Sequence, residues 1–237
     1  MDFITHSPTP ILNTPHFKKV YGERLPFDDQ ELVREVEMIA LPGMVFEVIQ
    51  EEKEGILQVK TDDYPSASSL YLDARAGEKA LSIKKRKVEL PSVEMILSRM
   101  VSKVGTPYVW GGNYSAGIPE WAEWYPPKDM LTSFEEAHWL FKGVDCSGLL
   151  FEATNGFTPR NTSWLMKYGI EIALTDVKPL DLILYPGHVI IVLDENEVIE
   201  SNHEKGGVLI SPLEQRISEI KKPMMVRRFH PASFQTP

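Results

Sequence analysis

The sequence predicts an α+β protein, in which a small β-barrel precedes a larger domain whose helices come before an antiparallel sheet. Two observations predict this order. Between residues 31 and 85, short β-rich runs alternate with acidic turns, whereas after residue 86 a helical pattern comes first and β-rich runs follow. With 237 residues, the chain is long for one average domain and short for two large ones. We therefore expect one full-sized domain beside a smaller one.

Composition and charge narrow the range of partners. The 25 Lys and Arg residues against 34 Asp and Glu residues give a net charge of −9, which disfavours nucleic acid as a partner. A single cysteine excludes an intrachain disulfide and a zinc site made of thiolates. The N-terminus has no secretory signal pattern, and no apolar run is long enough to cross a bilayer. We expect a cytoplasmic protein without a membrane partner, cofactor or metal; the sequence does not predict its oligomeric state.

Residues 1–30 are expected to form an extended lead-in, because they are rich in proline and show little periodicity. The β-rich runs that follow are Met44–Ile49, Gly55–Lys60 and Leu70–Leu72. Short strands separated by turn residues are typical of a small β-barrel. Leu41-Pro42-Gly43 resembles the opening of bacterial SH3-like modules, so residues 31–85 are interpreted as an SH3-like β-barrel.

The second domain is expected to span residues 86–237, after a charged linker at residues 80–89. Ser92 is a suitable N-cap for a helix whose buried face would carry Val93, Ile96, Leu97 and Met100. A second helix is predicted near Cys146–Thr154. The β-rich runs after it are Asp181–Tyr185, His188–Leu193, Val198–Ser201 and Val208–Ile210.

The only cysteine, Cys146, lies in the first turn of the predicted second helix. Asp145 is the candidate N-cap, and Leu149, Leu150 and Ala153 would give this helix a buried side. The unpaired N–H groups of a first turn favour the thiolate, which is the nucleophilic form of cysteine. The alternative is a buried, inert cysteine, the commoner fate of a lone one.

A thiol nucleophile needs a base within reach and a third group that orients the base. His188 stands at the start of a strong strand, and the next strand returns antiparallel after a turn. Because side chains alternate along a strand, Glu200 and Asn202 share one face while His203 lies on the other. Glu200 is therefore the best candidate to hold the His188 ring, with Asn202 and His203 as alternatives.

These residues resemble the NlpC family of bacterial cell-wall cysteine endopeptidases, which have a papain-like fold. The resemblance covers roughly the last 140 residues. Its pieces, in the order of the family, are Pro107–Gly112, Asp145–Gly148, Pro159–Thr162, Pro179–Leu182, Gly187–Val189 and Val198–Glu200.

The resemblance implies roles for individual residues. Cys146 matches the nucleophile, His188 the base and Tyr108 a tyrosine near the oxyanion. Glu200 falls at the position of the orienting residue, which is commonly His in the family, so this chain departs from the pattern there.

The resemblance also implies a substrate. Family members with an SH3-like module cut the bond after γ-D-Glu in murein peptides that keep a free N-terminal L-Ala, L-Ala-γ-D-Glu-diamino acid. The lack of a secretory signal pattern favours a role in recycling imported cell-wall peptides over remodelling of the wall. Asp145 matches the position that pairs with the free amine. Ser147, Arg160 and Thr162 match the positions that hold the α-carboxylate of D-Glu, a group that an Arg fork suits. Tyr64, in the acidic turn of the module, is a further candidate contact.

Residues 113–144 are the clearest departure from the family in length. This insertion carries Trp121, Trp124 and Trp139 and would either roof the substrate groove or pack on the core. The spacing of Phe134, Ala137, His138 and Phe141 favours a short helix packed on the core for His138 and leaves Trp121 and Trp124 open.

Three other functions compete with the thiol hydrolase. A papain-like acyltransferase would use the same nucleophile and base. A catalytically dead peptide-binding protein would not need the Cys146 and His188 pair. Metal-dependent hydrolysis through His188, Glu200 and His203 conflicts with the face on which His203 is predicted to lie.

Overall fold

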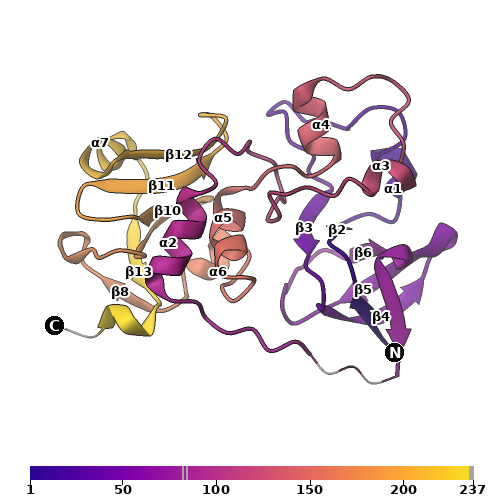
Figure 1. The fold of residues 1–237 in the computed structure, drawn as a ribbon, viewed down its shortest axis with the longest axis horizontal. Coiled ribbons are helices and arrows are strands. Elements are labelled where there is room, and N and C mark those ends of the chain that lie inside the picture. Colours follow the sequence, from indigo (N-terminus) through magenta and orange to yellow (C-terminus); the bar gives the residue numbers. More distant parts are fainter. Residues whose placement is uncertain (82, 84, 235–237) are drawn as a thin grey trace. The chain divides into compact units, whose positions relative to one another are not determined.

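The computed structural model describes residues 1–81, 83 and 85–234, in two compact units that are described separately here (Figure 1). Unit 1 comprises residues 1–87 and 109–143, and unit 2 comprises residues 88–108 and 144–237. The segment 109–143, which the sequence analysis assigned to the second domain, thus clusters with the N-terminal unit. Lys84 of the charged linker lies outside the described residues.

Within the described part of unit 1, seven strands form one antiparallel sheet in the order β3-β2-β6-β5-β4-β1-β7. The strands are β1 (Asp2–Thr5), β2 (Thr9–Leu12), β3 (Val36–Ala40), β4 (Val45–Glu51), β5 (Ile56–Lys60), β6 (Leu70–Asp73) and β7 (Gly77–Ala80). The helices are α1 (Phe17–Val20), α3 (Trp121–Trp124) and α4 (Ser133–Trp139), with 3-10 turns η1 (Lys53–Gly55) and η2 (Ala74–Ala76). The three β-rich runs predicted between residues 44 and 72 are confirmed as β4, β5 and β6.

The prediction of an extended lead-in over residues 1–30 was wrong, because β1 and β2 are strands of this sheet. Pro10 lies inside β2, where it aligns with Ile39 of β3. Proline offers no N–H to a neighbouring strand and is therefore disfavoured inside sheets. The strand tolerates it because the pairing of β2 with β6 is confined to Leu12 and Tyr71, away from Pro10.

The aromatic insertion completes the core of unit 1. Trp121, Trp139 and Phe141 are fully buried there, together with residues of the N-terminal segment such as Tyr21. The rings of Tyr21 and Trp139 meet edge to face, with centroids 5.6 Å apart. Of the two roles left open for the insertion, the structure supports core packing for Trp121.

Within the described part of unit 2, six strands form an antiparallel sheet in the order β12-β11-β10-β9-β13-β8. The strands are β8 (Ile170–Ile172), β9 (Leu182–Tyr185), β10 (His188–Val192), β11 (Glu197–Asn202), β12 (Gly207–Pro212) and β13 (Met225–Arg228). The helices are α2 (Val93–Val101), α5 (Cys146–Ala153), α6 (Thr162–Leu165) and α7 (Leu213–Glu219), with 3-10 turns η3 (Leu174–Asp176) and η4 (Pro231–Phe234). The order of helices before the main strands, predicted from the sequence, is confirmed.

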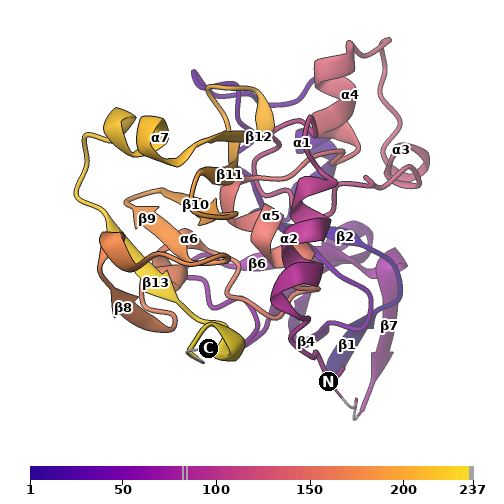
Figure 2. The ribbon, with the colours of Figure 1, turned by 60° about the vertical axis from the view of Figure 1, so that its left-hand side comes forward.

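The sheet of unit 2 buries both of its faces. Leu182 and Ile191 point to the face that α2 and α5 cover, and these two helices lie side by side (Figures 1 and 2). Ile183 and Ile190 point to the opposite face, which Leu213 of α7 covers. This alternation follows from the two-residue period of a strand. Helix α5 therefore packs against β10 and β11 on one face, and α7 packs against β11 and β12 on the other.

Both predicted helix starts of unit 2 are confirmed. The side chain of Ser92 accepts a hydrogen bond from the N–H of Met95, and that of Asp145 accepts one from the N–H of Gly148. Such caps satisfy donors that a first turn leaves unpaired. Across the described residues, every helix is too short or too polar to span a bilayer.

Candidate active site

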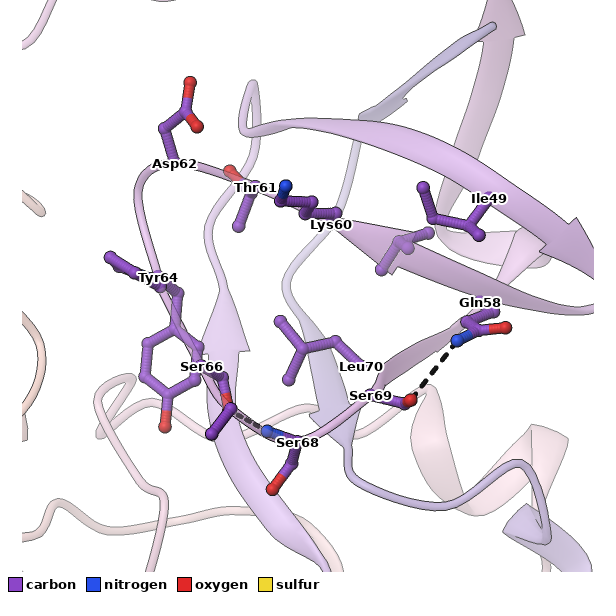
Figure 3. A pocket seen from close by; sticks show the side chains of 13 residues that line it. Ile49, Gln58, Lys60, Thr61, Asp62, Tyr64, Ser66, Ser68, Ser69 and Leu70 are labelled. Atoms are coloured by element: carbon purple, nitrogen blue, oxygen red, sulfur yellow. Dashed lines mark hydrogen bonds between the residues drawn. The ribbon is translucent and has the colours of Figure 1, made fainter.

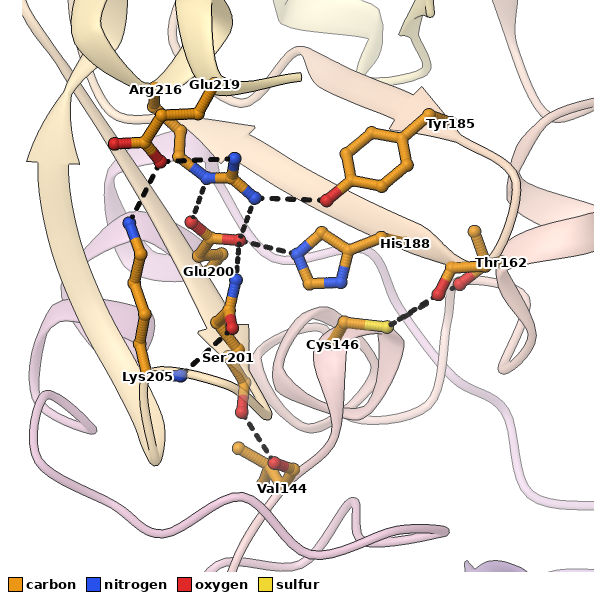
Figure 4. Close-up of polar contacts among 12 residues, drawn as sticks. Val144, Cys146, Thr162, Tyr185, His188, Glu200, Ser201, Lys205, Arg216 and Glu219 are labelled. Carbon is orange, nitrogen blue, oxygen red and sulfur yellow. Dashed lines mark hydrogen bonds and ion pairs between the residues drawn. The ribbon is translucent and has the colours of Figure 1, made fainter. Parts of the chain in front are cut away.

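Cys146 is the first residue of α5, and its buried thiol lies near two oxygen atoms. The residue is 6% exposed. Its Sγ lies 3.7 Å from Oγ1 of Thr162, which begins α6, and 3.9 Å from the carbonyl oxygen of Gly187 (Figure 4). The start of a helix directs backbone N–H groups and the positive end of the helix dipole toward this sulfur. Sequence reasoning predicted this position.

His188 begins β10, directly after the tight turn Pro186-Gly187 that joins it to β9. Gly187 has a φ of +90°, a backbone conformation that glycine adopts without strain. The turn aligns Tyr185 with His188, and their rings pack at an interplanar angle of 35° with centroids 5.3 Å apart. The imidazole thereby presents one edge toward Cys146 (Figure 4).

Glu200 of β11 binds the opposite edge of the imidazole. Val192 aligns with Val198 and Ile191 with Ile199; continuing this register makes His188 and Glu200 diagonal neighbours on one face. The Oε2 atom of Glu200 lies 2.5 Å from Nε2 of His188. An ionised carboxylate only accepts hydrogen bonds, so Nε2 carries the proton and the lone pair of the neutral ring is on Nδ1.

His188 and Glu200 shift each other's pKa values in opposite directions. Burial alone would lower the pKa of His188, but hydrogen bonds to Cys146 and Glu200 and their negative charges raise it to about 9. Burial likewise opposes the ionisation of Glu200. Its hydrogen bonds to His188, Arg216 and Asn202 and the charge of His188 prevail and lower its pKa to about 2.

Of the three candidates for orienting the base, Glu200 is the one whose side chain contacts the ring of His188. Asn202 instead donates from Nδ2 to Oε2 of Glu200 at 3.1 Å. His203 packs edge-on against Tyr108, with ring centroids 5.2 Å apart. The departure from the family's common histidine therefore leaves a polar partner on His188.

Sequence reasoning missed Arg216 of α7, which contacts Glu200 from the side opposite α5. Its Nε donates to Oε1 of Glu200 at 2.5 Å, and its Nη2 donates to Oε2 at 3.1 Å and to the hydroxyl of Tyr185 at 3.0 Å. Arg216 is 6% exposed. The sequence does contain one indication that Arg216 is buried. Arg216 follows Leu213 by three residues, which places both side chains on one face of a short helix.

Asp145, Ser147 and Arg160 form a buried cluster at the start of α5. Arg160 donates from Nη1 and Nη2 to the two carboxylate oxygens of Asp145, at 2.9 and 2.5 Å. Its Nη1 also lies 2.9 Å from Oγ of Ser147. Three of the five residues predicted to bind substrate are thus brought together, and Asp145 both caps α5 and pairs with Arg160. Their contact with substrate stays a prediction.

Tyr108 belongs to the same unit as Cys146. The carbonyl oxygen of Pro107 accepts a hydrogen bond of 3.1 Å from the N–H of Val144, which ties the backbone beside Tyr108 to the chain leading into Cys146. The predicted role of Tyr108 near the oxyanion is untested by these contacts.

Tyr64 lies in unit 1 and lines a pocket of about 370 Å³ formed by β4, β5 and the segment between β5 and β6 (Figure 3). Its hydroxyl donates to Oε2 of Glu37 at 2.7 Å. A contact of Tyr64 with substrate stays a prediction.

The arrangement fits nucleophilic catalysis by a thiol. A nucleophile, an imidazole whose raised pKa favours its protonated form, and an ionised orienting group follow one another from Cys146 through His188 to Glu200. This sequence of groups is the general pattern of an activated nucleophile. Throughout residues 1–81, 83 and 85–234, no group of three His, Cys, Asp or Glu side chains is arranged to hold a metal ion.

Comparisons with known proteins point to the same region of the chain. The NlpC/P60 family matches residues 105–228, just over half of the chain. The peptidoglycan endopeptidase RipB of Mycobacterium tuberculosis, strain H37Rv, is 30% identical over 129 residues, which are 52% of this chain and 48% of RipB. The chain thus spans about half the length of this curated relative.

Two solved structures are among those that are similar to this chain. The structure of RipB from Mycobacterium tuberculosis is 28% identical and has a TM-score of 0.43, over 57% of this chain and 63% of that one. An NlpC/P60 family protein from Bacillus cereus ATCC 10987 is 17% identical with a TM-score of 0.45, over 97% of this chain and 64% of that one. From the extent of the family match, which includes Cys146, His188 and Glu200, this chain belongs to the NlpC/P60 family.

Proposed function

We propose that the protein is a cysteine endopeptidase that hydrolyses the γ-D-glutamyl–diamino acid bond of murein peptides carrying a free N-terminal L-Ala. One observation carries the hydrolase part of this proposal: His188 is held between Cys146 and the buried, ionised Glu200. A structural cysteine would need neither an imidazole beside it nor a carboxylate that orients the ring.

The mechanism follows from the protonation of the ring. Nδ1 of His188 takes the proton of the Cys146 thiol, and the sulfur attacks the carbonyl carbon of the γ-glutamyl amide. The resulting imidazolium then gives its proton to the leaving amine as the C–N bond breaks, which leaves a thioester on Cys146. Water, deprotonated by Nδ1, attacks the thioester and releases the acid and the free thiol. Glu200 stabilises the imidazolium in both steps.

The substrate class is supported by the family. RipB, which is similar to this chain over about half of its own length, is a peptidoglycan endopeptidase. For the bond, the support is the resemblance of Ser147, Arg160 and Thr162 to the family positions that hold the α-carboxylate of D-Glu. In this structure the two Nη groups of Arg160 bind Asp145, so the arginine would have to share its donors with the substrate. Asp145 would pair with the free amine of L-Ala.

The rest of the proposal concerns architecture and setting. We assign unit 2 to the papain-like fold and unit 1, with its short antiparallel strands, to the SH3-like modules. A substrate with a free L-Ala amine must first be detached from its glycan by an amidase. The enzyme would therefore act on released peptides in recycling, and a cytoplasmic location can be tested by cell fractionation.

The direct test is to incubate the protein with L-Ala-γ-D-Glu-diaminopimelate and to follow the dipeptide L-Ala-D-Glu by mass spectrometry. We expect release of the dipeptide by the wild type and none by Cys146→Ala or His188→Ala, because these remove the nucleophile and the base. Release by Cys146→Ala at the wild-type rate would refute the thiol mechanism.

Two further experiments test whether the free amine is recognised and whether the reaction is hydrolysis or acyl transfer. N-acetylation of L-Ala should abolish cleavage, and continued turnover would refute recognition of the free amine. If an added amine appeared in the product in place of water, the acyltransferase alternative would replace hydrolysis.

A further inference from the structure

We propose that Arg216 is a positioning residue for the Cys146–His188 pair, because one guanidinium holds both groups that fix the imidazole. The inference rests on the proposed function only for its kinetic readout. It assigns a role to α7, an element that contributes none of the residues predicted from the sequence.

The geometry makes Arg216 a bridge. Glu200 contacts His188 at the edge of the ring, through Nε2, whereas the Tyr185 ring packs against the imidazole at an interplanar angle of 35°. Arg216 donates to both carboxylate oxygens of Glu200 and to the Tyr185 hydroxyl (Figure 4). Three donated hydrogen bonds in one plane allow little rotation of either partner. The orientation of the His188 ring therefore depends on a residue that does not touch it.

The charge of Arg216 matters as well as its shape. Glu200 is 1% exposed, so its ionised form depends on nearby cations. The titratable or charged groups near Glu200 come from four elements: His188 on β10, Arg216 on α7, Tyr185 on β9 and Cys146 on α5. On the outer side of Arg216, Glu219 pairs with both Arg216 and Lys205. Arg216 is the one permanent cation in direct contact with this carboxylate among the described groups.

Arg228 offers a matched control. It is also buried, at 8% exposure, and also donates to both oxygens of a buried carboxylate, that of Asp181. This pair joins β13 to the start of β9 and includes neither Glu200 nor His188. Arg228→Met should therefore destabilise the fold without altering the chemistry of Cys146.

The first measurement requires no substrate. The full-length protein is treated with iodoacetamide at a series of pH values, and alkylation of Cys146, the only cysteine, is followed by intact mass. Iodoacetamide reacts with the thiolate. For Arg216→Met we expect the pH midpoint of the alkylation rate to rise by up to about one unit. Without this cation Glu200 is more easily protonated, and it then no longer stabilises the His188 imidazolium beside the thiolate. The midpoint of Arg228→Met should stay at the wild-type value.

The second measurement uses the peptide. The kcat of Arg216→Met should fall about 10- to 100-fold, as for residues that orient a reacting group through another residue. The KM should stay unchanged, because Arg216 is buried and contacts Glu200, Tyr185 and Glu219. Arg216→Lys keeps the charge but lacks the fork, so we expect a lowered kcat with a midpoint near that of the wild type.

The outcomes are distinct. Wild-type midpoint and kcat in Arg216→Met would overturn the proposal, as would an equal midpoint shift in Arg228→Met. If Arg216→Met does not fold, Arg216→Lys decides, since a wild-type kcat in that variant would refute the bridging role. Failure of the wild type to cleave the peptide would refute the proposed function and leave the alkylation result standing.

Discussion

Glu200 is a carboxylate in an environment that excludes water, and it stays ionised only through its partners. Its pKa of about 2 lies below the ordinary value of 4.5, so its pairing stabilises the fold above pH 4.5, and this contribution is lost as the pH falls through about 2. For His188 the sign is reversed. Its pKa of about 9 lies above 6.5, so the stabilisation is complete below pH 6.5 and is lost as the pH rises through about 9.

Glu200→Gln should lower the pKa of His188 from about 9 toward the ordinary value of 6.5. The amide keeps the shape of the side chain but removes the negative charge that helps to raise the pKa. The measurement is an NMR titration of labelled histidine, with the His188 signal assigned from its loss in His188→Gln. His203→Gln, which alters a histidine packed on Tyr108, should leave the His188 titration in place. An unchanged midpoint in Glu200→Gln would contradict the coupling.

The sequence predicted the site residues whose partners lie nearby along the chain, and it did not predict the one whose partner is set by packing between elements. Cys146 was predicted from the capping pattern around Asp145, and the pairing of Glu200 with His188 from strand alternation across a short turn. Arg216 was missed because its partner lies across the sheet, and the face on which α7 packs is decided by Leu213 and Ile217. No local spacing contains that information.

Helix α5 depends on a residue with two roles. Asp145 caps the helix through Gly148 and also neutralises the buried Arg160. The loss of either role affects the segment that carries Cys146. The two roles are separable, because an asparagine keeps the acceptor oxygen and loses the charge.

Asp145→Asn should lower the free energy of unfolding by about 3–5 kcal/mol, since it leaves the cation of Arg160 buried without its anion. Asp145→Ala should lower it by about 1 kcal/mol more through the lost cap. Urea denaturation measures both. Ser92→Ala is the matched control, because Ser92 caps α2 with a neutral hydroxyl, and its loss should cost about 1 kcal/mol. An Asp145→Asn variant no less stable than Ser92→Ala would contradict the prediction.

Among the elements, strands with a regular pattern were predicted and β2 was not. β4 and β5 carry β-branched and apolar runs bounded by turn residues. β2 contains Pro10, which argues against a strand inside a sheet. Only the register with β6, confined to Leu12, explains why proline is tolerated there.

At the scale of the whole chain, residues 109–143 were assigned to the domain that flanks them in sequence and belong to the other unit. The pattern of Phe134, Ala137 and His138 predicted a helix with a buried side, and α4 confirms the helix, although Phe134 stays largely exposed. Amphipathicity indicates that a face is buried without indicating the core that buries it. The partners, such as Tyr21, lie about a hundred residues earlier in the chain.

Trp121→Ala should lower the free energy of unfolding by about 3–5 kcal/mol, because the side chain is fully buried among Phe17, Tyr21 and Tyr125. Thermal unfolding followed by near-ultraviolet circular dichroism measures the change. Trp164→Ala removes a tryptophan that is 46% exposed and should shift stability by no more than about 0.5 kcal/mol. Equal effects of the two substitutions would contradict the assignment of Trp121 to this core.

The division of the chain into alternating segments, 1–87, 88–108, 109–143 and 144–237, has a consequence for dissecting the protein. No single cut frees one unit intact. A chain that begins at residue 88 would lack the N-terminal residues that cover Trp139 and Phe141. These two side chains would be exposed, and we expect such a chain to aggregate.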